Sequence, residues 1–301
     1  MKNWPSLAPF GKCISIPGGD LFYYDSGNSA PDSGAADKPA LVLIHGLGDE
    51  ADTWRHVFPI LAAAGYRVIA PDLPGFGRSV WKGKIGVNCH SDAILRLISM
   101  TGAAESGHPA VLAGSSMGAG ISEMAAFKRP DLIKGLILID GCFPFKGGIG
   151  KGFYLLGLPH IGEKWYRGFR KNHEAAWKSL YPYYRDLDAM NTEDRDFLRE
   201  RVIARVESTD QEHGYLSTMR SMNVFFLFWK QRMIRKIKSY PGKISFLWGE
   251  EDGVLSPDKA DLVRSIRPDA ELVFIPGAGH LPQQEKPEFC AEQMLRILKE
   301  D

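Results

Sequence analysis

The sequence lacks an excess of charge of either sign. Its 301 residues include 37 Lys and Arg and 36 Asp and Glu, which gives a net charge of +1 and an isoelectric point near 7.7. Proteins that bind nucleic acids or other polyanions through their overall charge carry a clear basic excess. We therefore expect no nucleic-acid partner and an ordinary small molecule as the substrate.

Long hydrophobic runs are also absent. No stretch approaches the roughly 20 consecutive apolar residues that cross a bilayer. The first residues, MKNWPSLAPFGKC, contain no apolar run followed by a small-residue cleavage site, which is the pattern of a secretory signal peptide. We therefore expect a cytoplasmic protein without stable membrane insertion.

Cysteine is scarce and isolated. The four cysteines are Cys13, Cys89, Cys142 and Cys290. None lies in a CxxC pair or at a spacing from histidine that is typical of a zinc site. We expect buried, reduced thiols, and neither a metal ion nor an organic cofactor.

The chain does contain an alternation of short apolar runs with segments of helical pattern. Such an alternation is typical of a parallel sheet covered by helices on both faces. The segment 18–27, GGDLFYYDSG, indicates an earlier edge strand, for which an antiparallel orientation is one possibility. We expect an α/β fold with a mostly parallel sheet of about eight strands. The predicted strands of the alternating part are 40–46, 66–72, 110–114, 135–140, 243–249 and 271–277.

The alternation is interrupted between Cys142 and Tyr240. Residues 141–240 hold 18 of the 33 aromatic residues and have 18 Lys and Arg against 11 Asp and Glu, a net charge of +7. They show helical patterns at 162–180 and 192–208 but no convincing buried strand. We therefore expect a helical cap, residues 142–240, inserted into a core formed by residues 1–141 and 241–301.

The most apolar stretch of the cap is NVFFLFW, residues 223–229. At seven residues it is too short to cross a membrane. Packing in a core is the favoured interpretation, because aromatic residues on helices are mostly buried. Lining of an acyl pocket and contact with a lipid surface are the alternatives.

Two adjacent serines lie where a predicted buried strand meets a predicted helix. Residues 114–118, GSSMG, match the pattern G-x-S-x-G with Ser116 at the centre, whereas Ser115 lacks the flanking glycines. In this context the first glycine permits a tight turn, and the second allows the helix to pack closely on the strand. The following helix would place backbone N–H groups beside a developing negative charge. Ser116 is therefore the predicted nucleophile.

A serine nucleophile needs a base, and the base needs an orienting acid. His280 lies in a glycine-rich loop directly after the last predicted strand, and Asp252 follows the strand before it. The chain order Ser116, Asp252, His280 is one of the known orders of a catalytic triad. We predict that His280 is the base and that Asp252 is the acid. The alternative acids are Asp140, Glu250 and Glu251.

Together these motifs resemble the α/β-hydrolase superfamily, in its capped branch of esterases and related hydrolases. The resemblance covers LVLIHGLGDEADTW, VIAPDLPGFGRS, GSSMGAG, WGEEDGVLSPDKA and PGAGHLPQQEKPEFC. It implies an α/β-hydrolase fold with an inserted cap. It also implies an oxyanion hole in which the backbone N–H groups of Leu47, after the His45-Gly46 pair, and of Met117 stabilise the oxyanion. His45 itself is expected to be structural.

The resemblance implies a serine hydrolase that cleaves carboxylic esters of small to medium acyl chain through an acyl-enzyme. Ser116 argues against epoxide hydrolases and haloalkane dehalogenases, which attack with an aspartate. Carbon–carbon bond hydrolases, lactonases and thioesterases stay open, although the loop HGLGDEADTW lacks the Gly-Pro-Gly run associated with carbon–carbon hydrolases. A ligand-binding receptor on the same fold is the alternative from a different class.

Overall fold

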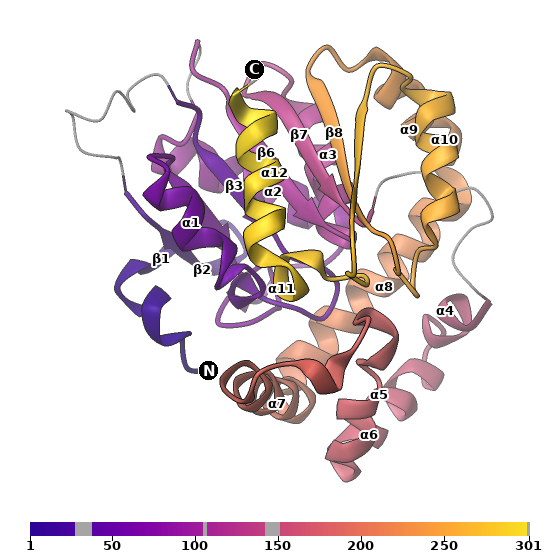
Figure 1. The fold of residues 1–301 in the computed structure, drawn as a ribbon. Helices are drawn as coiled ribbons and strands as arrows, with labels where there is room; N and C mark the ends of the chain where they lie inside the picture. The colour runs from indigo at the N-terminus through magenta and orange to yellow at the C-terminus, as the bar shows by residue number, and fades with distance from the viewer. Residues whose placement is uncertain (28–37, 105–106, 142–150, 300–301) are drawn as a thin grey trace.

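The computed structural model describes residues 1–27, 38–104, 107–141 and 151–299 (Figure 1). Within them a nine-stranded sheet has the order β1-β2-β4-β3-β6-β7-β8-β9, and β5 pairs with β2 beside this path. Strands β4 to β9 of this order run parallel, whereas β1 and β2 are antiparallel to their neighbours. The strands are β1 Gly11–Ile16, β2 Gly19–Asp25, β3 Leu41–Ile44, β4 Val68–Pro71, β5 Val80–Trp81, β6 Ala110–Ser115, β7 Ile133–Ile139, β8 Lys243–Gly249 and β9 Glu271–Ile275.

Helices cover both faces of the sheet because the side chains of each strand alternate between the faces. In β3, Val42 and Ile44 pack with α2 and α3, whereas Leu41 and Leu43 pack with α1 and α12. Figure 1 shows α1 and α12 in front of the sheet and α2 and α3 behind it. The helices of these layers are α1 Val57–Ala63, α2 Val87–Thr101, α3 Met117–Lys128, α10 Ala260–Ile266, α11 Pro282–Glu285 and α12 Pro287–Lys299.

All six strands predicted for the alternating part of the chain are present. The prediction of an edge strand at 18–27 is wrong in one respect, because β1 pairs along β2 and forms the edge itself. β1 escaped prediction since most of its side chains are exposed and it has no continuous apolar run. With β1 and the two-residue β5, the sheet has nine strands rather than about eight.

The stretch between β7 and β8 is helical in the part that the structure describes. Figure 1 shows α5, α6 and α7 gathered below the sheet. The predicted start of the cap, at residue 142, falls outside the described residues. The helical pattern at 162–180 forms two helices, because Asn172 ends the first and its side chain accepts a hydrogen bond from the N–H of Ala175. The helices are α4 Lys151–Leu156, α5 Ile161–Lys171, α6 His173–Lys178, α7 Thr192–Glu207, α8 Thr209–Phe228 and α9 Lys230–Ser239.

Buried ion pairs join α7 to the loop that follows β3. Arg201 contacts Glu50 at 2.6 Å and Asp52 at 3.1 Å, and Arg205 contacts Asp49 at 2.9 Å and Glu50 at 2.8 Å. These side chains are nearly inaccessible to solvent, so their charges depend on one another for compensation. The helical segment is thereby fixed to the loop that carries the predicted oxyanion donor.

Three cysteines lie in the described residues, and none of them forms a disulfide there. Cys290 is buried, as predicted, and Cys89 is half-buried. The prediction is wrong for Cys13, which is exposed because it lies on the edge strand β1. Cys142 lies outside the described residues. In the same part of the chain, no helix is long and apolar enough to cross a membrane.

Candidate active site

Ser116 occupies a sharp turn between β6 and α3. Its backbone has φ of 53° and ψ of −114°, a conformation that is rare for a residue with a side chain. The N–H of Ser116 donates a hydrogen bond of 2.8 Å to the carbonyl of Ile139 at the end of β7. The neighbouring strand therefore holds the strained turn at the carboxyl end of the sheet.

Two glycines make this turn possible. A Cβ atom on Gly118 would lie 2.2 Å from the carbonyl oxygen of Ile44, and a Cβ atom on Gly114 would lie 2.2 Å from that of Gly118. Real Cβ atoms do not approach oxygen atoms this closely. The tight packing of α3 against β3 and β6 thus requires the two glycines of the G-x-S-x-G pattern.

The structure brings Ser116, His280 and Asp252 together. His280 Nε2 lies 2.9 Å from Ser116 Oγ, and His280 Nδ1 lies 2.8 Å from Asp252 Oδ2. With the proton of Nδ1 donated to the carboxylate, Nε2 is free to accept the hydrogen bond of the serine hydroxyl. His280 and Asp252 are buried, so little water competes for these contacts.

The loop after β8 fixes Asp252. Its Oδ1 atom accepts hydrogen bonds of 2.8 Å from the N–H groups of both Val254 and Leu255. Both carboxylate oxygens are therefore engaged, one with the backbone of its own loop and one with His280. These bonds hold the carboxylate in one orientation.

Asp140, the main competing candidate for the acid, lies beside Asp252. It is fully buried at the end of β7 with φ of 45°, and its Oδ1 atom accepts a hydrogen bond of 2.8 Å from the N–H of Gly249. Burial, together with the charge of Asp252, raises the pKa of Asp140 well above its usual range. The raised pKa favours the neutral form of Asp140, and the imidazole of His280 pairs with Asp252 instead.

Glu250 and Glu251, next to Asp252 in the sequence, face solvent rather than the imidazole. Both are exposed, and Glu251 pairs with Arg185 at 2.8 Å. Neither glutamate therefore occupies the position beside His280 that Asp252 holds.

Ser115, the first serine of the adjacent pair, lies below the surface of the sheet's carboxyl edge. It is buried, and its Oγ atom accepts a hydrogen bond of 3.2 Å from the side chain of Gln283. The imidazole of His280 contacts Ser116 instead, so of the two serines Ser116 is the one that has a histidine within hydrogen-bonding distance.

The predicted oxyanion donors lie on two sides of the serine. Met117 follows it in sequence, and a Cβ atom on Gly46 would lie 3.5 Å from Ser116 Cβ, which places the peptide bond to Leu47 next to the nucleophile. In the described part of the chain, the N–H groups of Leu47 and Met117 donate to no protein acceptor. Their role in oxyanion binding stays a prediction.

His45 holds that peptide in place. Its Nε2 atom accepts a hydrogen bond of 2.9 Å from the N–H of Leu73, so the proton resides on Nδ1, which donates to the carbonyl of Gly46 at 2.7 Å. Burial lowers the pKa of His45, so the ring stays neutral. Because the Gly46 carbonyl and the Leu47 N–H belong to one planar peptide, this contact orients the predicted donor.

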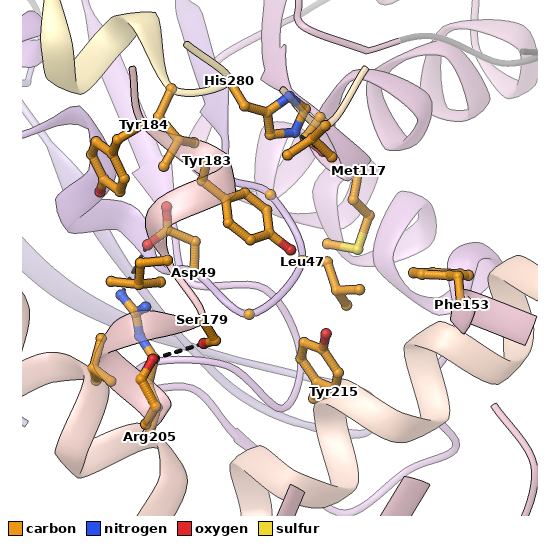
Figure 2. Close-up of a pocket in the computed structure, with 18 of the residues that line it drawn as sticks. Leu47, Asp49, Met117, Phe153, Ser179, Tyr183, Tyr184, Arg205, Tyr215 and His280 are labelled. Atoms are coloured by element: carbon orange, nitrogen blue, oxygen red, sulfur yellow. Dashed lines mark hydrogen bonds and ion pairs between the residues drawn. The ribbon is translucent and has the colours of Figure 1, made fainter. Parts of the chain in front are cut away.

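A cavity of about 420 Å³ opens above Ser116 and His280, between the sheet and the helices that follow β7 (Figure 2). Its walls are mostly apolar, and aromatic rings from the helical segment predominate. In the described residues, no group of three His, Cys, Asp or Glu side chains is arranged to hold a metal ion. The aromatic lining residues are Phe153, Trp165, Tyr166, Phe169, Tyr183, Tyr184, Tyr215 and Phe226.

Two of these tyrosines bring hydroxyl groups into the cavity. Figure 2 shows the hydroxyls of Tyr183 and Tyr215 directed toward the region of Leu47. Among the described residues, neither hydroxyl forms a hydrogen bond with the protein, whereas Tyr184 donates to Gln284 at 2.9 Å. Burial raises the pKa of both Tyr183 and Tyr215, so both are neutral and able to donate. The sequence indicated only that this segment is rich in aromatic residues.

Comparisons with known proteins agree with this architecture. The profile of the alpha/beta hydrolase family matches residues 41–293. Lipase 1 of Psychrobacter immobilis is 27% identical over 284 residues, which cover 91% of this chain and 79% of the relative.

Solved structures of other hydrolases match the fold of this chain over most of its length. An esterase from Thermogutta terrifontis matches with a TM-score of 0.74 at 21% identity, over 96% of this chain and 98% of its own. A meta-cleavage product hydrolase from Pseudomonas fluorescens matches with a TM-score of 0.71 at 20% identity, over 97% of this chain and 98% of its own. At such identities the likeness concerns the fold alone.

Proposed function

The chain belongs to the alpha/beta hydrolase family, and on that premise we propose that it is a serine hydrolase of carboxylic esters. Ser116 is the nucleophile, His280 the general base and Asp252 the orienting acid. The observation that carries the proposal is the continuous contact from Ser116 Oγ through His280 to Asp252, at 2.9 and 2.8 Å, on the floor of the cavity. Residues 142–240 act as a cap over a core of residues 1–141 and 241–301.

Acylation begins when His280 Nε2 takes the proton of the Ser116 hydroxyl as Oγ attacks the ester carbonyl. The imidazolium that forms is stabilised by Asp252, whose geometry is already fixed by its own loop. The N–H groups of Leu47 and Met117 stabilise the oxyanion, and one such donor contributes about 3 kcal/mol. The alcohol leaves with the proton from His280, and Ser116 carries the acyl group.

Deacylation uses the same groups, with water in place of Ser116 as the attacking group and Ser116 in place of the alcohol as the leaving group. Water enters between His280 and the acyl group and gives a proton to Nε2 as it attacks the carbonyl. The second tetrahedral intermediate then collapses, the acid is released, and Ser116 recovers its proton.

The cavity supports a substrate of small to medium size. Its volume of about 420 Å³ and its aromatic walls suit a short or branched acyl chain or an aromatic group. Among the relatives, one is named a lipase and another, from Klebsiella pneumoniae, a pimeloyl-[acyl-carrier protein] methyl ester esterase, at 27% and 24% identity. These names favour ester cleavage for this chain.

The test is a panel of p-nitrophenyl esters of increasing acyl length, with a vinylogous diketone, a lactone and a thioester as competitors. We expect the short and medium esters to give the highest kcat/KM. Faster turnover of the diketone than of any ester would make the protein a carbon–carbon bond hydrolase. Faster turnover of the lactone or of the thioester would make it a lactonase or a thioesterase. Tight binding of a compound with almost no turnover would favour a receptor.

A further inference from the structure

The end of α8 exposes large apolar side chains. Val224, Leu227 and Phe228 are 54%, 64% and 78% exposed. Their spacing of three and four residues places them on one face of the helix. Single exposed apolar residues are common on protein surfaces, but a group of them indicates an interaction site.

A second apolar group lies next to this face. The side chain of Asn223 donates to the carbonyl of Phe153 at 3.4 Å, and Arg220 donates to the carbonyl of Gly157 at 3.0 Å, so α8 packs against α4 and the turn after it. This turn region adds further exposed side chains to the surface. They are Leu155, Leu158 and Ile161, which are 52%, 49% and 42% exposed.

Helix α9, which follows directly, has a cationic outer face. Its inner side chains, Met233 and Ile237, are buried, and the helix contains no acidic residue. In the described part of the chain, none of its basic side chains forms an ion pair. The outer basic residues are Lys230, which is half-exposed, and the exposed Arg232, Arg235, Lys236 and Lys238.

A tryptophan marks the boundary between the apolar and the cationic parts. Trp229 separates α8 from α9 and is 40% exposed. Its ring stacks on that of Phe225 with centroids 6.2 Å apart, and the guanidinium of Arg232 lies 4.8 Å from its centroid. Tryptophan beside arginine is typical of the headgroup level of a bilayer, where an amphipathic ring contacts both apolar and charged groups.

The run 223–229, for which core packing was the favoured prediction, therefore divides into three parts. Phe225 is buried, Phe226 lines the cavity above Ser116, and Val224, Leu227, Phe228 and Trp229 are exposed. The prediction of core packing is wrong for these four exposed residues. The same turn of α8 thus contacts the substrate cavity on one side and the outer surface on the other.

We propose that the surface formed by the exposed apolar residues of α4, α5 and α8 and by the basic face of α9 docks the protein on an anionic lipid bilayer. The apolar side chains enter the boundary between headgroups and acyl chains, and the cations of α9 pair with the negative headgroups. The charge of α9 selects an anionic bilayer over a neutral one. Docking there brings the cavity next to the lipid phase, and this last consequence rests on the proposed ester chemistry.

The test is co-sedimentation of the full chain with vesicles of phosphatidylcholine, with or without phosphatidylserine. Binding is expected only to the anionic vesicles and is expected to weaken with salt. Because each cation near an anionic surface contributes about a fivefold factor, changing Arg232, Arg235 and Lys236 together to Gln is expected to weaken binding about a hundredfold. The Ser116→Ala variant is expected to bind like the wild type, which separates docking from catalysis.

The apolar part is tested by the double variant Leu227→Ser, Phe228→Ser, with Met100→Ser as its matched control. Met100 is 55% exposed on α2, away from this surface. The double variant is expected to lose at least tenfold in vesicle affinity. The Met100→Ser control is expected to keep the vesicle affinity of the wild type. For the charge, Lys82→Gln is the control and is expected to bind normally, because Lys82 is exposed and lies beside the β1–β2 hairpin, where its N–H donates to the carbonyl of Gly18.

Two results would overturn the proposal. One is equal binding, or no binding, to neutral and anionic vesicles by the wild type. The other is a wild-type dimer in sedimentation velocity that the double variant makes monomeric while neither binds vesicles, because the surface would then join two copies of the chain. If the double variant fails to fold, the fluorescence of Trp229 is measured on the intact protein with brominated lipid, and Trp229→Phe serves as the blank. Quenching of Trp229 is expected, and no quenching would overturn the proposal.

Discussion

The backbone N–H of His280 donates a hydrogen bond of 2.9 Å to the carbonyl of Tyr183. His280 lies in the loop after β9, whereas Tyr183 lies in the short 3-10 helix Tyr181–Tyr183 of the helical segment. Their rings also contact, with centroids 5.7 Å apart. The segment that covers the cavity therefore holds the loop of the proposed base, so a displacement of one moves the other.

The free hydroxyls of Tyr183 and Tyr215 are expected to bind an oxygen atom of the substrate. Tyr183→Phe and Tyr215→Phe leave the rings in place and remove one hydrogen bond each, so kcat/KM is expected to fall about three- to tenfold for esters with a second oxygen near the carbonyl. The matched measurement uses the methylene analogue of the same ester, for which no change is expected. Tyr184→Phe, whose hydroxyl is engaged by Gln284, is the control variant. Equal losses on both esters would show that the hydroxyls do not select the substrate.

Gly118→Ala is expected to destabilise the protein and to reduce its activity. The new Cβ atom would lie 2.2 Å from the Ile44 carbonyl, so α3 has to move away from β3 and carry Ser116 with it. The expected loss in the free energy of unfolding is about 1–3 kcal/mol. Gly168→Ala in α5 is the control, because a Cβ atom there meets nothing within 4 Å, and it is expected to stabilise by up to about 1 kcal/mol. If Gly118→Ala left the free energy of unfolding in urea unchanged, the proposed packing would be contradicted.

Arg201→Met is expected to cost about 3–5 kcal/mol in the free energy of unfolding, because Glu50 and Asp52 lose a shared buried partner. Arg199→Met, on the same helix, is the control: its pair with Glu174 is half-exposed and contributes at most about 1 kcal/mol. Both values are measured by urea unfolding. Similar losses for the two variants would mean that the buried network does not fix the helical segment.

Asp140→Asn is expected to change how stability depends on pH. The carboxyl of Asp140 has a raised pKa in the native protein, whereas it ionises near pH 3.9 once unfolded. As the pH rises above that value, the unfolded state loses this proton first, so the group's contribution to stability falls until the native carboxyl ionises. Asparagine keeps an acceptor for the Gly249 N–H and does not titrate. The free energy of unfolding of the variant relative to the wild type should therefore rise with pH. If the free energies of the two proteins changed with pH in parallel, the raised pKa of Asp140 would be contradicted.

Sequence patterns were sufficient for most of the sheet, since the parallel strands β3, β4, β6, β7 and β8 are buried almost throughout and read as continuous apolar runs, and β9, although only partly buried, has the same apolar pattern. β1 lacks such a run, because only the final residue, Ile16, is buried. Helix patterns predicted the helical character of residues 192–208. They did not predict which residues of 223–229 face outward, because burial there depends on how α4 and α9 pack around α8.

The site was predictable where chemistry imposes a local pattern. The glycines around Ser116 and the chain order of Asp252 and His280 are visible in the sequence, and the structure brings these three side chains within hydrogen-bonding distance. The cavity hydroxyls of Tyr183 and Tyr215 were not predictable. Both lie among many aromatic residues, and only the tertiary packing separates the tyrosines with a partner from those without one.

We propose that Ser116, and not its neighbour Ser115, is the nucleophile. A fluorophosphonate that phosphonylates active serine residues, followed by peptide mapping, tests it directly. A single label on Ser116 is expected. The Ser116→Ala variant is expected to remain folded but to lose the label and on the order of 10⁶-fold in kcat, and Ser115→Ala is expected to keep both the label and the activity. A label on Ser115 or on another residue, or ester hydrolysis that survives in Ser116→Ala, would contradict it.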